Sequence, residues 1–91
     1  MRFLYKREFL KRFDSYHQAI QELIIKTDQQ IKEYLMTGLA PYGLRVRKIG
    51  PKTFEARVSD RIRVVWVKEK ELVSFVLLGD HDEVRRFIKQ I

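Results

Sequence analysis

The stretch FEARVSDRIRVVWVKEKELVSFVLLG, residues 54–79, decides the fold of this chain. Its first two thirds alternate apolar and polar residues with a period of two, which is typical of half-buried β-strands. Short polar connections at 59–60 and 69–70 predict tight hairpins. The last part, 71–79, lacks alternation, which predicts a strand covered on both faces. We therefore expect consecutive antiparallel strands at 54–59, 61–68 and 71–79.

The residues before this stretch follow a helical period instead. Apolar residues recur at steps of three and four between Phe9 and Leu35, which predicts an apolar stripe along two helices. Ser15, followed three residues later by Gln18, resembles a capping box and predicts that the second helix starts there. Helical spacing returns at the C-terminal end. The further elements that we expect are a short strand at 3–5, helices at 6–13 and 16–36, a strand at 44–49 and a helix at 82–91.

This order, β-α-α-β-β-β-β-α, predicts one α+β domain spanning 1–91, in which a helical hairpin lies against an antiparallel sheet. The chain contains no cysteine, which excludes disulfides, thiol catalysis and cysteine-bound zinc. No apolar run is long enough to span a membrane, and residues 1–15 lack the apolar region of a signal peptide. We expect a soluble cytoplasmic protein that does not bind membranes.

The net charge of +7 is concentrated in the middle of the chain. Residues 44–68 hold eight Lys or Arg against two Asp or Glu, a net charge of +6. A basic block of this kind indicates a polyanion or an acidic protein as the partner. The alternative is an ordinary solvated surface on a protein rich in charged residues.

Strand alternation sorts these charges onto one face of the sheet. Apolar residues such as Ala56, Val64 and Trp66 face the helical hairpin, so we assign Trp66 to the core. Val65 on the opposite face predicts that the last helix covers part of it. Glu55 shares that face and could instead pair with Arg57 or Arg63 as neighbours across strands. The arginines expected to converge there are Arg45, Arg47, Arg57, Arg61 and Arg63.

The segment Gly79-Asp80-His81-Asp82 opens the last helix beside these arginines. Asp80 or Asp82 can cap that helix, and acids in its first turn suit the helix dipole. His81 can transfer protons near neutral pH. We expect His81 to face the basic surface, and we expect no metal and no cofactor, because consecutive residues rarely converge on one ion.

The run FEARVSDRIRVVWVKEKELVSFVLLGDHDEV resembles the C-terminal half of toxins of the RelE/ParE superfamily, the toxic partners in type II toxin–antitoxin pairs. In that family a strand with an arginine precedes a "YR" strand, an apolar strand and a G-x-H-D start of the last helix. The resemblance implies a RelE-like fold. It also implies a cognate antitoxin protein as the partner, whose acidic or amphipathic segment lies across the basic face.

The resemblance assigns catalytic roles to three residues. Arg63 stands at the position of the "YR" arginine, which stabilises the scissile phosphate, Arg57 matches the basic residue on the preceding strand, and His81 matches a proton-transferring histidine. Two departures concern neighbours of these residues: Ile62 replaces the usual Tyr, and Arg85 stands where many relatives have a Tyr. The basic residues that we expect to bind nucleic acid are Arg45, Arg47, Lys48, Lys52, Arg61 and Arg85.

These roles imply a metal-independent endoribonuclease that cleaves messenger RNA on the ribosome and represses translation. Such a site needs a base for the 2′ proton, an acid for the 5′ oxygen and cations for the developing charge. Asp82, Glu83 and Glu55 are candidate bases, and Lys52 is a candidate for stabilising charge. The alternative is a ParE-like toxin that inhibits DNA gyrase without catalysis. A plain RNA-binding module would need exposed aromatic residues on the basic face, and alternation places none there.

Overall fold

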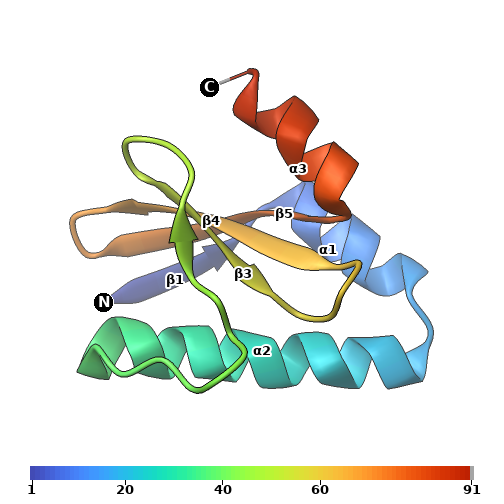
Figure 1. The fold of residues 1–91 in the computed structure, drawn as a ribbon, viewed down its shortest axis with the longest axis horizontal. Coiled ribbons are helices and arrows are strands. Elements are labelled where there is room, and N and C mark those ends of the chain that lie inside the picture. Colours follow the sequence, from blue (N-terminus) through green and yellow to red (C-terminus); the bar gives the residue numbers. More distant parts are fainter. Residues whose placement is uncertain (91) are drawn as a thin grey trace.

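Eight elements follow one another in the predicted order (Figure 1). The structure, a computed structural model, describes residues 1–90, so the last position of the predicted final helix lies outside the described residues. The elements are β1 (Arg2–Tyr5), α1 (Arg7–Ser15), α2 (Gln18–Thr37), β2 (Arg47–Lys48), β3 (Thr53–Arg57), β4 (Arg63–Glu69), β5 (Leu72–Gly79) and α3 (His81–Ile88).

The strands form a five-stranded sheet in the order β1-β5-β4-β3-β2. β2 to β5 are antiparallel neighbours, which confirms the predicted antiparallel region. β1 adds a fifth strand parallel to β5. The α1–α2 hairpin carries the chain from β1 to β2 at the opposite edge of the sheet, and β2 to β5 then return it to the side of β1. The fold class is therefore α+β, as expected.

The helices lie on both sides of the sheet: α1 and α2 pack on one face and α3 stands on the other (Figure 1). The core lies under the hairpin, where Phe75 is fully buried. Its ring stacks on Tyr5 at a centroid distance of 4.9 Å and contacts Trp66 at 6.4 Å. Trp66 is also fully buried, which confirms its assignment to the core.

A β-bulge in β5 explains why its sequence lacks alternation. Val65 pairs with Leu77, but the next residue, Trp66, pairs with Phe75, so β5 holds one extra residue at this point. The extra residue reverses the alternation. Phe75 and Leu78 therefore both reach the core under the hairpin, while Leu77 shares the α3 face with Val65.

Three predicted boundaries are wrong for local reasons. The strand expected at 44–49 shrinks to two residues, because Arg45 has a φ of 51° and leaves the extended conformation. Arg61 lies in the connection before β4 rather than on the strand. Ser15 does not cap α2: it closes α1, and its hydroxyl donates to the backbone carbonyl of Arg12 at 2.6 Å. The N-cap position of α2 is His17.

Candidate functional site

The candidate site is a row of residues that crosses three strands where β4 begins. Arg57 on β3 lies opposite Arg63 on β4, and Arg63 lies opposite Gly79 at the end of β5. Neighbouring strands are roughly 4.8 Å apart, so the row spans about 10 Å. The expectation that Arg57 and Arg63 share one face is confirmed.

His81 is the first residue of α3, two positions beyond Gly79, so it lies next to this row. Asp80 is the N-cap: its Oδ1 accepts from the backbone N–H of Glu83 at 2.8 Å, and Glu83 Oε1 accepts from the backbone N–H of Asp80 at 3.1 Å. This capping box confirms the structural role expected for one of the acids. His81 itself is exposed.

The arginine row carries positive charge that the described residues hardly neutralise. Arg63 is half-buried, and among residues 1–90 its side chain makes no hydrogen bond or ion pair. Arg57 has one loose ion pair, 3.9 Å from Nη1 to the exposed Asp60, and its buried Nε has no partner in the same part of the chain. Like charges directly across two strands repel each other. An anion with several acceptor oxygens would relieve this repulsion and accept these donors.

Glu55, a candidate base, forms an ion pair with Arg47 instead of with Arg57 or Arg63. It is buried, and its Oε2 lies 3.3 Å from Nε of Arg47 on β2. The expected pairing of Glu55 with Arg57 or Arg63 is therefore wrong in its partner, which is Arg47. The pair leaves Arg57 and Arg63 unneutralised, but it reduces the charge that Arg47 offers to a ligand.

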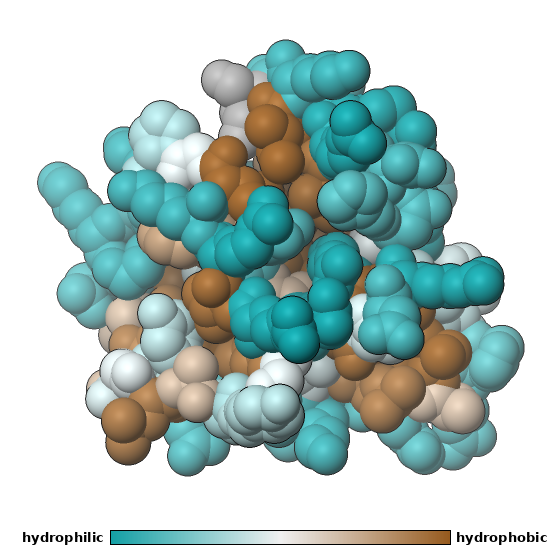
Figure 2. Space-filling view, in the orientation of Figure 1, coloured by the Kyte–Doolittle hydropathy of each residue, from teal (hydrophilic) through white to brown (hydrophobic). Residues whose placement is uncertain are grey.

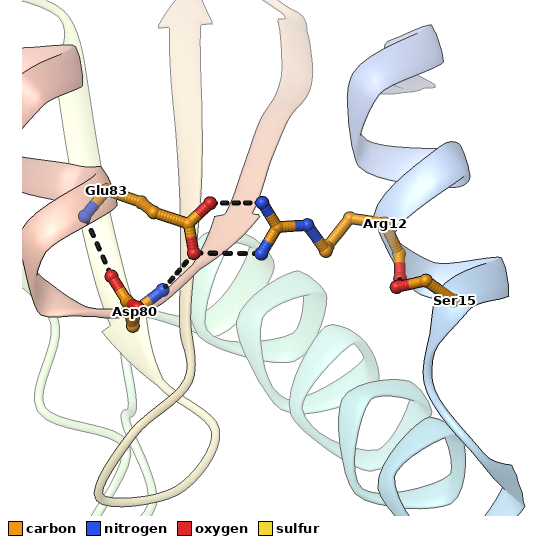
Figure 3. Close-up of polar contacts among 4 residues, drawn as sticks. All are labelled: Arg12, Ser15, Asp80 and Glu83. Atoms are coloured by element: carbon orange, nitrogen blue, oxygen red, sulfur yellow. Dashed lines mark hydrogen bonds and ion pairs between the residues drawn. The ribbon is translucent and has the colours of Figure 1, made fainter.

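Glu83 is excluded as a base by its contacts (Figure 3). Both of its oxygens accept hydrogen bonds from the guanidinium of Arg12 on α1, and Oε1 also accepts from Asp80. The hydrogen bonds from Arg12 lower the pKa of the Glu83 carboxyl below its ordinary value of 4.5. These three hydrogen bonds fill most of the roughly four acceptor positions of the carboxylate, and with a lowered pKa it lacks the basicity to take a proton at neutral pH. Nothing in the sequence pattern pointed to Arg12, which stands 71 positions from Glu83.

The remaining basic residues are spread over the molecule. Lys52 does not join the site. Its backbone carbonyl accepts from the backbone N–H of Lys68, and Lys68 lies five residues along β4 from Arg63, roughly 17 Å from it. The ammonium of Lys52 pairs with Glu69 there. Lys48 lies opposite Phe54 and so points to the hairpin side of the sheet. Arg85 is exposed one helical turn after His81, and so lies on the same side of α3 as that histidine. Arg45 and Arg61 are exposed in the connections between strands.

Figure 2 shows hydrophilic side chains over the middle of the visible face, between α3 and α2. The aromatic residues of the neighbouring strands, Phe54 and Trp66, pack into the core under the hairpin. Within residues 1–90, no group of three His, Asp or Glu side chains is arranged to hold a metal ion, and no helix is long and apolar enough to cross a membrane. The arrangement is suited to a phosphate-containing ligand.

Comparison with known proteins identifies the fold. No protein-family model matches the chain, and no curated protein matches its sequence. Solved structures do match: the YoeB/ParE toxin from Agrobacterium tumefaciens has a TM-score of 0.67 at 13% identity, with 89% of this chain and 99% of that chain covered. The archaeal RelE–RelB complex from Pyrococcus horikoshii OT3 has a TM-score of 0.66 at 18% identity, covering 87% and 92%.

A further match is the RelB–RelE antitoxin–toxin complex from Methanococcus jannaschii, with a TM-score of 0.65 at 14% identity over 92% of this chain and 96% of that chain. All three matches cover most of this chain and more than nine tenths of the matched chain. The chain therefore has the fold of the RelE/ParE toxin superfamily, which its sequence motifs had indicated.

Proposed function

We propose that this chain is the toxin of a type II toxin–antitoxin pair, and that it is a metal-independent endoribonuclease that cleaves messenger RNA on the ribosome. The observation that carries the proposal is the row of Arg57 and Arg63 with His81 directly beyond its end. The fold is consistent with this reading, since the similar structures include toxins and antitoxin–toxin complexes.

In the proposed reaction, RNA supplies its own nucleophile. The 2′-oxygen attacks the adjacent phosphorus, the bond from phosphorus to the 5′-oxygen breaks, and a 2′,3′-cyclic phosphate and a 5′-hydroxyl result. Arg63 and Arg57 donate to the phosphoryl oxygens as negative charge grows on them. His81 transfers one of the two protons, either from the 2′-hydroxyl or to the leaving 5′-oxygen.

The second proton-transfer group has fewer candidates than the sequence suggested. Glu83 is bound by Arg12 and Glu55 by Arg47. Asp82, exposed in the first turn of α3, remains available as the other proton-transfer group. Arg85 lies one turn beyond His81 and would contact a neighbouring phosphate of the same strand.

We propose a cognate antitoxin as the natural inhibitor. An acidic segment laid across the Arg57–Arg63 row would supply carboxylates to the same donors that we assign to phosphate. Antitoxin and RNA would then compete for one surface. The complexes of similar fold from Methanococcus jannaschii and Pyrococcus horikoshii contain an antitoxin with the toxin.

Induced expression in bacterial cells, followed by mapping of the 5′ ends of messengers, tests the proposal. Wild type should arrest growth and create new messenger ends, and Arg63→Ala and His81→Ala should each reduce cleavage by roughly 100-fold. The matched controls are Arg7→Ala and His17→Ala, which remove exposed residues of the same types from α1 and the start of α2. Arrest with intact messengers and altered DNA supercoiling would instead favour gyrase inhibition.

A further inference from the structure

One ion pair joins the first helix to the last. Arg12, near the end of α1, donates from Nη1 to Oε1 of Glu83 at 2.8 Å, and its Nη2 donates to Oε2 (Figure 3). This two-point contact fixes the orientation of both side chains as well as their distance. It is partly shielded from water, since the Glu83 side chain is 19% exposed.

Arg12 borders an open hollow on the side of α1 that faces the end of β5. The hollow has a volume of about 280 Å³ and is lined by Arg12, Ser15, Leu77 and neighbouring residues. The two helices each pack on the sheet more than on one another, so the ion pair is a direct contact between them. Both helices pack on β5, and the ion pair adds a direct link between the end of α1 and the first turn of α3.

Glu83 links Arg12 to the first turn of α3, where His81 stands. Its Oε1 accepts from the backbone N–H of Asp80 as well as from Arg12, so one oxygen joins α1 to the capping box. A Cβ placed on Gly79 would come within 3.0 Å of the Glu83 Cβ, so the first turn of α3 also lies directly against the end of β5. His81 stands inside the four residues that these contacts hold.

We infer that Arg12 is a positioning residue that holds His81 beside Arg63 by fixing the first turn of α3 through Glu83. This inference rests on the proposed ribonuclease function for its effect on rate, but its effect on α3 is independent of activity. Both terminal nitrogens of Arg12 are occupied by Glu83, so Arg12 acts on the site through Glu83 rather than on the substrate.

Arg12→Met tests the inference, because it removes the guanidinium and keeps an unbranched apolar stem. Lys11→Met is the matched control: it removes one positive charge from the neighbouring exposed position of the same helix. Glu83→Gln is a second variant that keeps an acceptor for the capping box, since Gln serves at this position, while it weakens the contact with Arg12.

The first readout is hydrogen exchange at the backbone amides of Glu83 and Val84, which needs no activity. Both donate hydrogen bonds at the start of α3, to Asp80 Oδ1 and the Asp80 carbonyl. Arg12→Met and Glu83→Gln should speed exchange at these amides by about tenfold while the amides of β4 exchange as in Lys11→Met. Wild-type exchange at both amides in both variants would overturn the inference.

The second readout is the kinetics of messenger cleavage in a reconstituted translation reaction, at a temperature where every variant is fully folded. Arg12→Met should lower kcat by about tenfold with KM within roughly twofold, a smaller loss than removal of His81 itself, because the histidine is displaced and not lost. Arg12→Lys keeps the positive charge but has one donor nitrogen in place of the two that contact Glu83, so it should recover part of the rate.

A change in KM alone, or an unchanged kcat, would refute the positioning role. If wild type and Lys11→Met both fail to cleave, the proposed function fails, and the exchange measurement still decides whether Arg12 fixes the start of α3. If wild type cleaves and Arg12→Met cleaves equally well, the positioning inference fails and the proposed function stands.

Discussion

Gly79→Ala is the substitution that most sharply tests how the end of β5 supports the site. A Cβ at this position would lie 3.0 Å from the Glu83 Cβ, 3.1 Å from its Cδ and 3.1 Å from its Oε1. Carbon atoms pack best at about 3.5–4.0 Å, so the first turn of α3 must move by roughly 0.5 Å. That movement pulls Glu83 away from Arg12 and strains the capping box.

Two terms set the size of the effect. Overpacking at a site that cannot relax costs about 1–3 kcal/mol, and replacing Gly by Ala returns about 0.4–1 kcal/mol because the unfolded chain loses freedom. We therefore expect Gly79→Ala to lower the free energy of unfolding by about 1–2 kcal/mol, which corresponds to a Tm about 4–16 °C lower for a domain of this size.

Urea unfolding followed by tryptophan fluorescence measures this free energy directly. Trp66 is the single tryptophan of the chain and is fully buried, so its emission reports loss of the core. A double-mutant cycle with Glu83→Ala isolates the contact, because that change removes two of the three crowded Glu83 atoms. Gly79→Ala should cost at least 0.5 kcal/mol less, a rough threshold for coupling, in the Glu83→Ala background. Additive effects, or a Gly79→Ala protein as stable as wild type, would refute the close approach of α3.

Three further predictions follow from other contacts. Because Arg12 lowers the pKa of Glu83, the folded state favours the carboxylate. Its contribution is complete above the ordinary pKa of 4.5 and is lost as the pH falls through the lowered pKa, so in urea unfolding the stability of wild type should approach that of Glu83→Gln as the solution is acidified. Phe75→Ala should destabilise the core by about 3–5 kcal/mol in the same assay, and equal stability would contradict the aromatic packing. Tyr5→Phe removes the 2.6 Å hydrogen bond to Asp28 and should lower Tm by a few degrees, about 1 kcal/mol, since Asp28 keeps its ion pair with Lys32; an unchanged Tm would contradict this contribution.

The elements of the fold were predictable because their periodicity is strong. The alternation in 54–59 and 61–68 placed Ala56 and Val64 under the hairpin and Arg57 and Arg63 on the other face, and the structure confirms both. Alternation is reliable here because each strand is half-buried, so a residue on the wrong face would expose an apolar group or bury a charge.

The features that escaped prediction depend on contacts between distant residues or on single backbone angles. The bulge beside Val65 is set by the pairing of two strands and leaves only a loss of alternation in the sequence. The positive φ of Arg45 ends a strand that its alternation favoured. Arg12 and Glu83 are far apart in the chain, and only the packing of α1 and α3 around β5 brings them together.

The candidate site was predictable in part for the same reasons. The face of Arg57 and Arg63 follows from alternation, and the place of His81 follows from the capped start of α3 directly after a strand. Lys52 was wrongly placed near the site because the register of the β3–β4 hairpin, which sends it to the far end of the sheet, cannot be read from spacing alone.

Mapping of messenger 5′ ends in cells that express wild type, His81→Ala or Arg63→Ala tests the central claim most directly. We predict new 5′-hydroxyl ends in messengers with the wild type and a loss of roughly 100-fold in both variants, with His17→Ala and Arg7→Ala cleaving as wild type does. Undiminished cleavage in both variants, or growth arrest by the wild type with no new messenger ends, would contradict the assignment of a ribonuclease site to this row.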